Sequence, residues 1–455
     1  MPDVSSLCSL VEEFVEELLA DFQSPNIRGK KAIHDSLFGT NMFMQHEVAI
    51  IDTPFIQRLR RIAQTGLAYN TYPSATHTRF GHTLGVAMLA EKMARKINDA
   101  VPERIIDCDP TKGDLAELRM AALLHDCGHG FFSHLSEQIY GQQFRSDMDA
   151  VRKTHGQLGS CKEHEIVSYL IVKSKRFAQF FEDHINGPYK LNLDLANIAN
   201  YIIGYAKSER QYLAQIINGP FDVDKLDYIA RDSLFTGLQL NIDVERLFYT
   251  ISIANYRNQR NLVIDFYGAR AVEQLLFSKM LLFSSVYHHQ KVRACDCVIK
   301  GLVEFIIDKG IAVDGKPLTN PLNFVRLTDY DLFNKIGVGR DYVKKIIESI
   351  NNRVVLKRSL TLCKEAIDNY DDGILDVLLR LNDHPDEMRK LRRRIALRVG
   401  GDDTLTYSIW IDLPKRPELK EATSTLVRSP NGDVNTLDPH YFPVKGWCRR
   451  PDYLS

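Results

Sequence analysis

The chain has 455 residues, and 58 lysines and arginines balance 58 aspartates and glutamates, so its formal net charge is zero. A content of 44% hydrophobic and 25% charged residues is typical of a globular protein, and the length suits one large domain or two ordinary ones. A neutral chain has no overall field that attracts a polyanion or an anionic membrane, so any anionic ligand must be captured locally. Eight cysteines without a CxxC pair argue against a zinc ribbon or a disulfide framework, and we expect a cytoplasmic protein.

Residues 1–29 predict an amphipathic helix, because Val4, Leu7, Phe14 and Leu18 follow helical spacing within an acidic segment. This segment lacks the basic start and the unbroken apolar run of a signal peptide. No stretch of the sequence approaches the length of a membrane span, so we expect no membrane association.

Helical periodicity dominates the stretch that we assign to a core at residues 30–313, and a mixed lobe and tail follow at residues 314–455. Asp114 and Glu117 predict a capping box at the start of the helix that leads into LLHDCG. Two β-rich runs flank the polar turn YRNQRN, and TLTYSIWIDL has the pattern of a strand. The predicted fold is mainly α, with a small β-hairpin or sheet insertion and a mixed α/β C-terminal lobe.

Four segments concentrate histidines, carboxylates and basic side chains: THTRFGHTLG, LLHDCGHGFFSHL, CKEHEIVSYL and FDVDKLDYIARD. In the second segment His125 stands beside Asp126, which places two types of metal ligand at adjacent positions. Together with His82 and Asp224 they form a set of two imidazoles and two carboxylates. Such a set suits a divalent metal that keeps open positions for water and a phosphate oxygen.

The other polar side chains of these segments suit the remaining parts of a phosphorylated ligand. Arg79 and Lys225 would neutralise phosphate charge. Asp232 lies about 12 Å along a helix from Asp224, which suits a ligand with phosphate at one end and a hydroxylated sugar at the other. Three imidazoles are available near neutral pH as proton donors or phosphate contacts: His129, His134 and His164.

Each piece by itself also has an ordinary structural explanation. His82 could be a hydrogen-bonded helix histidine, and Tyr228 could simply pack in the core. The stripe formed by Asp224, Tyr228 and Asp232 could be a solvated helix face. The ordered combination of the four segments carries more weight than any one of them.

That combination carries a family resemblance. The order of histidines and aspartates in RFGHTLG, LLHDCGHG and VDKLDYIARD resembles the HD-domain metal-dependent phosphohydrolases. The segments DTPFIQRLRRIAQTG and GHGFFSH resemble the deoxynucleoside triphosphate triphosphohydrolases (dNTPases) of that superfamily, including the animal branch that joins a sterile-alpha-motif domain to the HD domain. The resemblance runs from about Lys30 to about Gly400. We expect no sterile-alpha-motif domain, because too few residues precede Lys30.

The resemblance implies a role for each motif residue. It implies that His82, His125, Asp126 and Asp224 bind a divalent metal (iron, manganese, magnesium, zinc or cobalt), and that the chain hydrolyses a dNTP to a deoxynucleoside and intact triphosphate. The implied proton-transfer residue is His164, with His129 and His134 close to the phosphates. The implied substrate contacts are Gln64, Arg79, Lys225, Tyr228, Asp232 and Tyr287. Among them, Gln64 and Asp232 would bind the 3′-hydroxyl, and Tyr287 would pack against the 2′ edge of the sugar.

The resemblance also implies regulation by GTP or dGTP at a subunit interface of a homo-oligomer, expected to be a tetramer. The matching positions are Lys31, Asp52, Gln57, Arg60, Arg394 and Arg398. By itself QRLRR is equally consistent with an ordinary charged helix face. The chain also departs from the family: Asp265 and its neighbours replace the basic residues of a second regulatory site, and Thr65 and Lys279 replace an apolar residue and an arginine.

The sequence therefore predicts a metal-dependent dNTP triphosphohydrolase. One alternative is an HD phosphohydrolase that acts on other nucleotides or on nucleic-acid ends. Another is a non-catalytic regulatory or nucleic-acid-binding protein that retains the motif. The zero net charge and the lack of a basic, aromatic-rich stripe argue against the second alternative.

Overall fold

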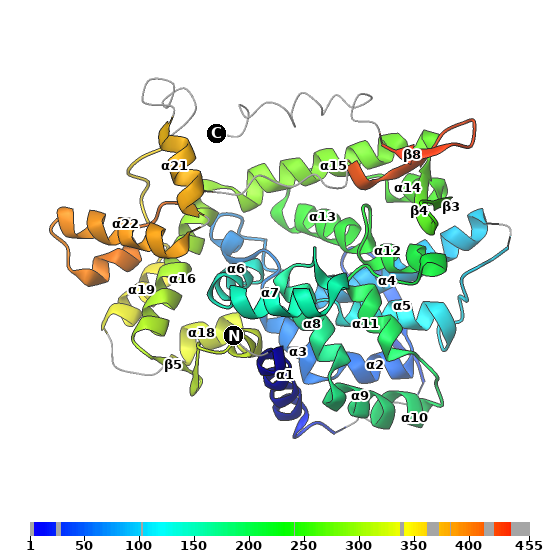
Figure 1. Cartoon of the computed structure of the whole chain (residues 1–455), viewed down its shortest axis with the longest axis horizontal. Coiled ribbons are helices and arrows are strands. Elements are labelled where there is room, and N and C mark those ends of the chain that lie inside the picture. The colour runs from blue at the N-terminus through cyan, green and yellow to red at the C-terminus, as the bar shows by residue number, and fades with distance from the viewer. Residues whose placement is uncertain are drawn as a thin grey trace.

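The computed structural model describes residues 4–23, 29–101, 103–240, 242–336, 341–361, 373–382, 384–413 and 423–437. Helices dominate these residues, and only short strands accompany them (Figure 1). The predicted mainly α fold with small sheets is confirmed. No helix in the described part of the chain combines the length and the apolar character that a membrane crossing requires.

The first half of the chain builds the helical core. Its main elements are α1 (Val4–Leu19), β1 (Lys31–Asp35), β2 (Gly39–Phe43), α2 (Gln45–Ile51), α3 (Pro54–Gln57), the 3-10 turns η1 (Arg58–Arg61) and η2 (Gly66–Asn70), α4 (Arg79–Ala100), α5 (Gly113–Leu124), α6 (His134–Gln143), α7 (Arg145–Thr154), α8 (Glu163–Lys173), α9 (Lys175–Phe181), α11 (Leu195–Ile202), α12 (Gln211–Ile217) and α13 (Val223–Thr236).

The second half adds a small sheet and a second group of helices. Its main elements are α14 (Val244–Thr250), β3 (Ile251–Tyr256), β4 (Gln259–Asp265), α15 (Ala269–Leu282), the π-helical turn η7 (Phe283–Tyr287), α16 (Gln290–Asp308), β5 (Ala312–Val313), β6 (Lys316–Pro317), α17 (Pro321–Arg326), α18 (Asp329–Asn334), α19 (Asp341–Asn351), α21 (Gly373–Asn382), α22 (Pro385–Arg398), the 3-10 turn η8 (Asp403–Ser408), β7 (Leu426–Arg428) and β8 (Val434–Thr436).

Helix α4 runs through the middle of the core, because most of its residues are buried and many of those are apolar. It packs along α5 and is crossed by α13. The crossing is close at Gly85: a Cβ there would overlap Asp227 Oδ1 and Arg231 Nη2 of α13. One helical turn earlier, a Cβ on Gly81 would lie at an ordinary 3.4 Å from Arg231 Nη1.

The predicted N-terminal helix is observed as α1, which lies beside the core near α3 and α9 (Figure 1). Leu7 and Phe14 are buried, as the helical spacing predicts, and so are Val11 and Val15. The carboxylate of Glu12 accepts hydrogen bonds from the first two backbone N–H groups of α9. This charge at a helix N-terminus helps to hold α1 in place.

The predicted hairpin is observed as β3 and β4, which pair antiparallel from Ile251–Ile264 to Tyr256–Gln259. Arg257 and Asn258 form the two-residue turn, and their φ angles of 50° and 62° match a type I′ hairpin turn. Strand β4 also pairs in parallel with β7, which pairs with β8, so the sheet order is β3-β4-β7-β8. The C-terminal strands thus return to the hairpin.

Two local predictions are wrong. Helix α5 begins at Gly113 without the capping box, because Asp114 accepts from the N–H of Asp107 and Glu117 turns toward the N–H of Asp194. The segment TLTYSIWIDL is not a strand: η8 covers its first part, and Tyr407 packs its backbone carbonyl close to Gly301 of α16. In both cases contacts with distant segments outweigh the local pattern.

The crossing of α4 and α13 predicts opposite effects for two glycine substitutions. Gly85→Ala should lower the free energy of unfolding by about 3 kcal/mol, because the added methyl overlaps a buried ion pair. Gly81→Ala should leave it unchanged or raise it by up to about 1 kcal/mol, because alanine favours the helix. Denaturant unfolding of both variants with a chelator present checks this; equal stability would contradict the close crossing.

Candidate active site

Three separate segments bring the predicted metal ligands together. His82 comes from the first turn of α4, His125 and Asp126 follow the end of α5, and Asp224 comes from the first turn of α13. His82 Nε2 lies 3.1 Å from Asp224 Oδ1 and 3.7 Å from Asp126 Oδ2. His125 Nε2 lies 3.3 Å from Asp126 Oδ1 and 4.0 Å from Asp224 Oδ1. The ligand atoms of His82, His125 and Asp224 all lie within 4.8 Å of one another, and Asp126 lies beside them.

The outer nitrogen of each imidazole is already bonded. His82 Nδ1 lies 2.7 Å from Asp227 Oδ2, and His125 Nδ1 lies 2.7 Å from the carbonyl oxygen of Ala122. Both bonds turn Nε2 toward the carboxylates. In metal-binding histidines, the ring nitrogen that does not bind the metal makes the same kind of hydrogen bond. Among the described residues, the buried Nε2 of His125 has no hydrogen-bond partner. A buried lone pair in this position fits a divalent cation.

Arg79 ties this cluster to the neighbouring loop. Its Nη1 donates to Asp126 Oδ2 at 2.6 Å, and its Nε donates to Ser133 Oγ at 2.8 Å. Burial alone would raise the pKa of Asp126, but Arg79 and the nearby imidazoles hold that pKa well below its usual range. The third guanidinium nitrogen, Nη2, is buried without a partner in the described part of the structure. It is free to donate to an anion.

A second cluster lies beside the first and contains one residue that the sequence analysis missed. The carboxylate of Glu137 accepts from His134 Nδ1 at 2.8 Å and from His164 Nδ1 at 2.7 Å. The ring of His129 stacks on His164 at 3.9 Å. The spacing of His134 and Glu137, three positions apart on one helix, was the signal that could have revealed Glu137.

The imidazoles of this second cluster differ in their affinity for a proton. Burial lowers the pKa of His129 well below its ordinary value, and Arg79 and the other imidazoles act in the same direction. Burial also lowers the pKa of His164, but the contact with Glu137 outweighs it and raises the pKa overall. Within this second cluster, His164 is therefore the imidazole best suited to carry a proton at neutral pH. Neither nitrogen of His129 has a hydrogen-bond partner among the described residues.

The predicted sugar end lies two helical turns further along α13. Asp232 Oδ1 lies 2.6 Å from His77 Nε2, and Tyr287 OH donates to Asp232 Oδ2 at 2.5 Å. Gln64 is adjacent in the fold, since its N–H donates to the carbonyl of His77. Its side-chain oxygen is buried and has no partner among the described residues. The structure thus joins Asp232 to Tyr287 and places Gln64 beside the backbone of His77. It also adds His77, which the sequence analysis did not single out.

Two predicted substrate contacts have other partners in this structure. The ammonium group of Lys225 donates to Asp222 Oδ2 at 2.5 Å and to the carbonyl of Gly219 at 2.9 Å. Tyr228 is partly buried and packs against the apolar core. Both residues lie on α13 between the metal-ligand end and the sugar end, as predicted.

The loop that carries His129 and leads into α6 is braced by polar contacts. Phe132 and Ser133 adopt φ angles of 50° and 56°, which non-glycine residues rarely adopt. Asp329 accepts the N–H of Phe132 at 2.6 Å. The guanidinium group of Arg58 donates to the carbonyl oxygens of His129, at 2.5 Å, and of Cys127. Such contacts hold a strained loop in one conformation.

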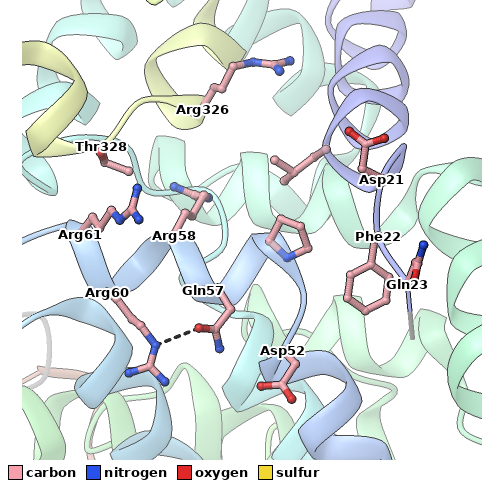
Figure 2. A pocket seen from close by; sticks show the side chains of 12 residues that line it. Asp21, Phe22, Gln23, Asp52, Gln57, Arg58, Arg60, Arg61, Arg326 and Thr328 are labelled. Carbon is pink, nitrogen blue, oxygen red and sulfur yellow. Dashed lines mark hydrogen bonds between the residues drawn. The ribbon is translucent and has the colours of Figure 1, made fainter. Parts of the chain in front are cut away.

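Three of the predicted regulatory positions line a separate pocket of about 650 Å³ (Figure 2). Asp52, Gln57 and Arg60 form one wall, and Arg60 Nε donates to Gln57 Oε1 at 2.9 Å. Lys31 lies beside this wall, with its Nζ 3.8 Å from Asp52 Oδ2. Asp21, Phe22 and Gln23, which follow α1, line the opposite side, and the other lining residues are Leu18, Pro54, Arg58, Arg61, Arg326 and Thr328.

The last two predicted regulatory residues lie elsewhere. Arg394 and Arg398 belong to α22 and are exposed, and the described residues that line the pocket do not include them. A single chain therefore does not assemble the predicted nucleotide site. The prediction requires α22 from a neighbouring chain.

The sequence was compared with models of known families and with known proteins. The family model of the HD domain matches residues 79–232, and the family model of the HD associated region matches residues 242–440. An uncharacterized protein of Methanocaldococcus jannaschii is 29% identical over 86% of this chain and 70% of its own length. An uncharacterized protein of Bacillus subtilis is 28% identical over 73% of this chain and 64% of its own.

Vertebrate dNTPases are also similar to the chain. The deoxynucleoside triphosphate triphosphohydrolase SAMHD1 of Gallus gallus is 31% identical over 57% of this chain and 43% of its own length, and that of Homo sapiens is 29% identical over 59% and 43%. The chain thus spans less than half the length of these two enzymes. Every predicted metal ligand falls inside the matched HD domain, on the segments that the fold brings together. The chain therefore contains an HD domain followed by an HD-associated region.

Proposed function

We propose that this HD-domain protein hydrolyses deoxynucleoside triphosphates to a deoxynucleoside and triphosphate. One observation carries the proposal: α13 presents Asp224 to the two imidazoles at one end and Asp232 to His77 and Tyr287 two turns later. A ligand with phosphate at one end and a sugar at the other matches that span. The resemblance to enzymes named as triphosphohydrolases supports the same reaction.

His82, His125, Asp126 and Asp224 would hold a divalent metal, with iron, manganese, magnesium, zinc and cobalt all compatible with two imidazoles and two carboxylates. When bound, such a metal supplies Lewis-acid stabilisation of charge at phosphorus and lowers the pKa of a bound water. Arg79 Nη2 is positioned to donate to a phosphate oxygen, because its other two nitrogens are held by Asp126 and Ser133.

Proton transfer falls to the second cluster. The attack of water on the α-phosphorus breaks the bond to the 5′-oxygen, which must gain a proton as it leaves. His164 suits that role, because Glu137 binds its Nδ1 and favours the protonated ring. His129, stacked on His164 and without a hydrogen-bond partner for either nitrogen among the described residues, suits a contact with the phosphates.

The sugar end supports a preference for deoxyribose. Gln64 and Asp232 offer acceptors for the 3′-hydroxyl, and the ring of Tyr287 would cover the 2′ edge. A 2′-hydroxyl there would be buried without a partner, which is costly. Thr65, which stands in place of a bulkier apolar residue in the family resemblance, and Lys279, which stands in place of an arginine, would loosen this discrimination.

The direct test is to incubate the metal-loaded protein with each dNTP and each NTP and to separate the products by chromatography. We expect dNTPs to give triphosphate and deoxynucleoside. The rate of NTP turnover should be lower than that of dNTPs by a factor of about 10 or more. Tyr287→Ala should narrow that preference, whereas Tyr287→Phe, which keeps the ring, should retain most of it. Release of monophosphate, pyrophosphate or a nucleic-acid end product would favour the other HD phosphohydrolase reactions, and equal turnover of GTP and dGTP would contradict the role of Tyr287.

The metal site predicts the outcome of a substitution at Asp224. Asp224→Asn should abolish turnover and lower the bound metal at least 10-fold, because it weakens one of four ligands. It is a cleaner test than Asp126→Ala, since Asp126 also pairs with the buried Arg79 and its loss should destabilise the fold. Asp149→Asn on the surface of α7 is the control. Elemental analysis that finds full metal occupancy in Asp224→Asn would exclude the assignment.

We further propose that GTP or dGTP binds the pocket at Asp52, Gln57 and Arg60 and promotes an active homo-oligomer, such as a tetramer. A carboxylate suits a guanine edge, and arginines suit phosphates. A ligand shifts assembly only if it binds the oligomer better than the single chain. Arg394 and Arg398 of a neighbouring chain would meet that condition, since one chain offers only part of the site.

This regulation predicts a response that specific arginines control. GTP should increase the sedimentation coefficient and the rate of dATP hydrolysis in the wild type, and Arg60→Ala and Arg394→Ala should abolish both responses. Arg145→Ala, an exposed arginine of α7 outside the pocket, is the control and should respond normally. A wild type whose assembly and rate both ignore GTP and dGTP would show that these residues form only a charged surface.

A further inference from the structure

A chain of buried ionisable groups leads from the β1–β2 hairpin to His82. Asp35 Oδ2 lies 2.9 Å from Arg231 Nη1. Arg231 donates to both oxygens of Asp227, from Nε at 2.8 Å and from Nη2 at 2.9 Å. Asp227 Oδ2 also accepts from His82 Nδ1 at 2.7 Å. The proposed reaction uses only the last member of this chain, so the other three need their own explanation.

These groups lie deep in the protein. The side chains of Asp35, Arg231, Asp227 and His82 are 6%, 3%, 0% and 1% exposed. Burying charges costs several kcal/mol per ion, and well-packed apolar residues are often at least as stable as a buried ion pair. Stability alone is therefore a weak reason for such a chain, and a role in fixing one arrangement of groups is a better one.

The backbone of α4 leaves room for this row of buried ionisable groups. Asp227 and Arg231 press against α4 at Gly85, where any side chain would overlap them, and Arg231 passes beside Gly81. His82 lies between these two glycines on the same helix. Helix α4, which carries His82, thus has glycines where Asp227 and Arg231 lie against it.

The β1–β2 hairpin fixes Asp35, which is the outer end of this row of ionisable groups. Asp35 Oδ1 accepts the backbone N–H groups of Leu37 and Phe38, each at 2.9 Å, which closes the turn between β1 and β2. The guanidinium carbon of Arg231 lies 5.8 Å from the ring centroid of Phe38. One carboxylate therefore joins the turn of the hairpin to the arginine that holds Asp227.

We propose that Asp35, Arg231 and Asp227 are positioning residues that orient the imidazole of His82 for a divalent metal. The inference rests on the proposed metal site. Asp227 accepts from His82 Nδ1 and so turns Nε2 of the same ring toward Asp224 and Asp126. Arg231 holds Asp227 in that orientation by two bonds, and Asp35 holds Arg231. Metal affinity then depends on the hairpin, although Asp35 is not itself a ligand.

A second buried ion cluster provides a matched control. Arg119 is 2% exposed and bonds both oxygens of Glu47, as Arg231 bonds Asp227. Its remaining bonds run to Glu91 and to the carbonyl of Met42. Arg119→Lys should therefore destabilise the core about as much as Arg231→Lys, without acting on His82.

The test is to titrate the full-length, metal-free protein with Mn²⁺ and to measure the dissociation constant and the melting temperature for Asp35→Asn, Arg231→Lys and Arg119→Lys. Asp224→Asn defines any binding at other sites. We expect Asp35→Asn and Arg231→Lys to weaken Mn²⁺ binding about 10-fold. Arg119→Lys should lower the melting temperature but keep the wild-type dissociation constant.

The outcomes separate the inference from the function on which it rests. A wild type that binds neither Mn²⁺ nor Co²⁺ would overturn the metal site and the inference together. A wild type that binds metal, with Asp35→Asn and Arg231→Lys unchanged in affinity, would overturn the inference alone. So would an equal loss of affinity in Arg119→Lys, which would make the effect one of general stability. If Arg231→Lys does not fold, the nearly isosteric Asp35→Asn decides the matter.

Discussion

The close crossing of α13 over α4 is the constraint on which the site depends. Because Gly85 has no side chain, Asp227 and Arg231 can lie against α4. That approach brings Asp224, one turn before Asp227, to 3.1 Å from His82 Nε2. It also sets where the rest of α13 runs, and therefore where Asp232 meets His77 and Tyr287. One helix–helix contact thus fixes both ends of the proposed substrate site.

The chain is neutral overall, but its charged side chains are concentrated at particular places around this crossing. Asp126 is buried with Arg79 on one side and imidazoles on the other, and the guanidinium group still has one unpaired nitrogen among the described residues. The separate pocket gathers Arg58, Arg60, Arg61 and Arg326. Both places attract anions through near contacts, not through a long-range field. The neutral composition and the proposed phosphate chemistry are therefore compatible.

Sequence patterns could predict those features of the site that depend on spacing along a single element. Arg79 and His82 share the first turn of α4, and Asp224 and Asp232 share one side of α13, because helical periodicity decides both. Such patterns could not show which distant group completes each contact. Asp227 meets His82, and Glu137 meets His164, only through tertiary packing, and Glu117 turns away from its expected cap for the same reason. Helical periodicity in the sequence determines which side chains share a helix face. Tertiary packing determines which distant group each of them bonds.

The same packing joins the separate pocket to the proposed active site through η1. Arg58 lines the pocket, yet its guanidinium group donates to the backbone carbonyls of Cys127 and His129. It also donates to the carbonyl of Val325, beside the pocket residue Arg326. A ligand that changes how η1 packs therefore acts directly on the backbone that places His129. Under the proposed regulation, a nucleotide would need no long path through the core, because one arginine belongs to both sites.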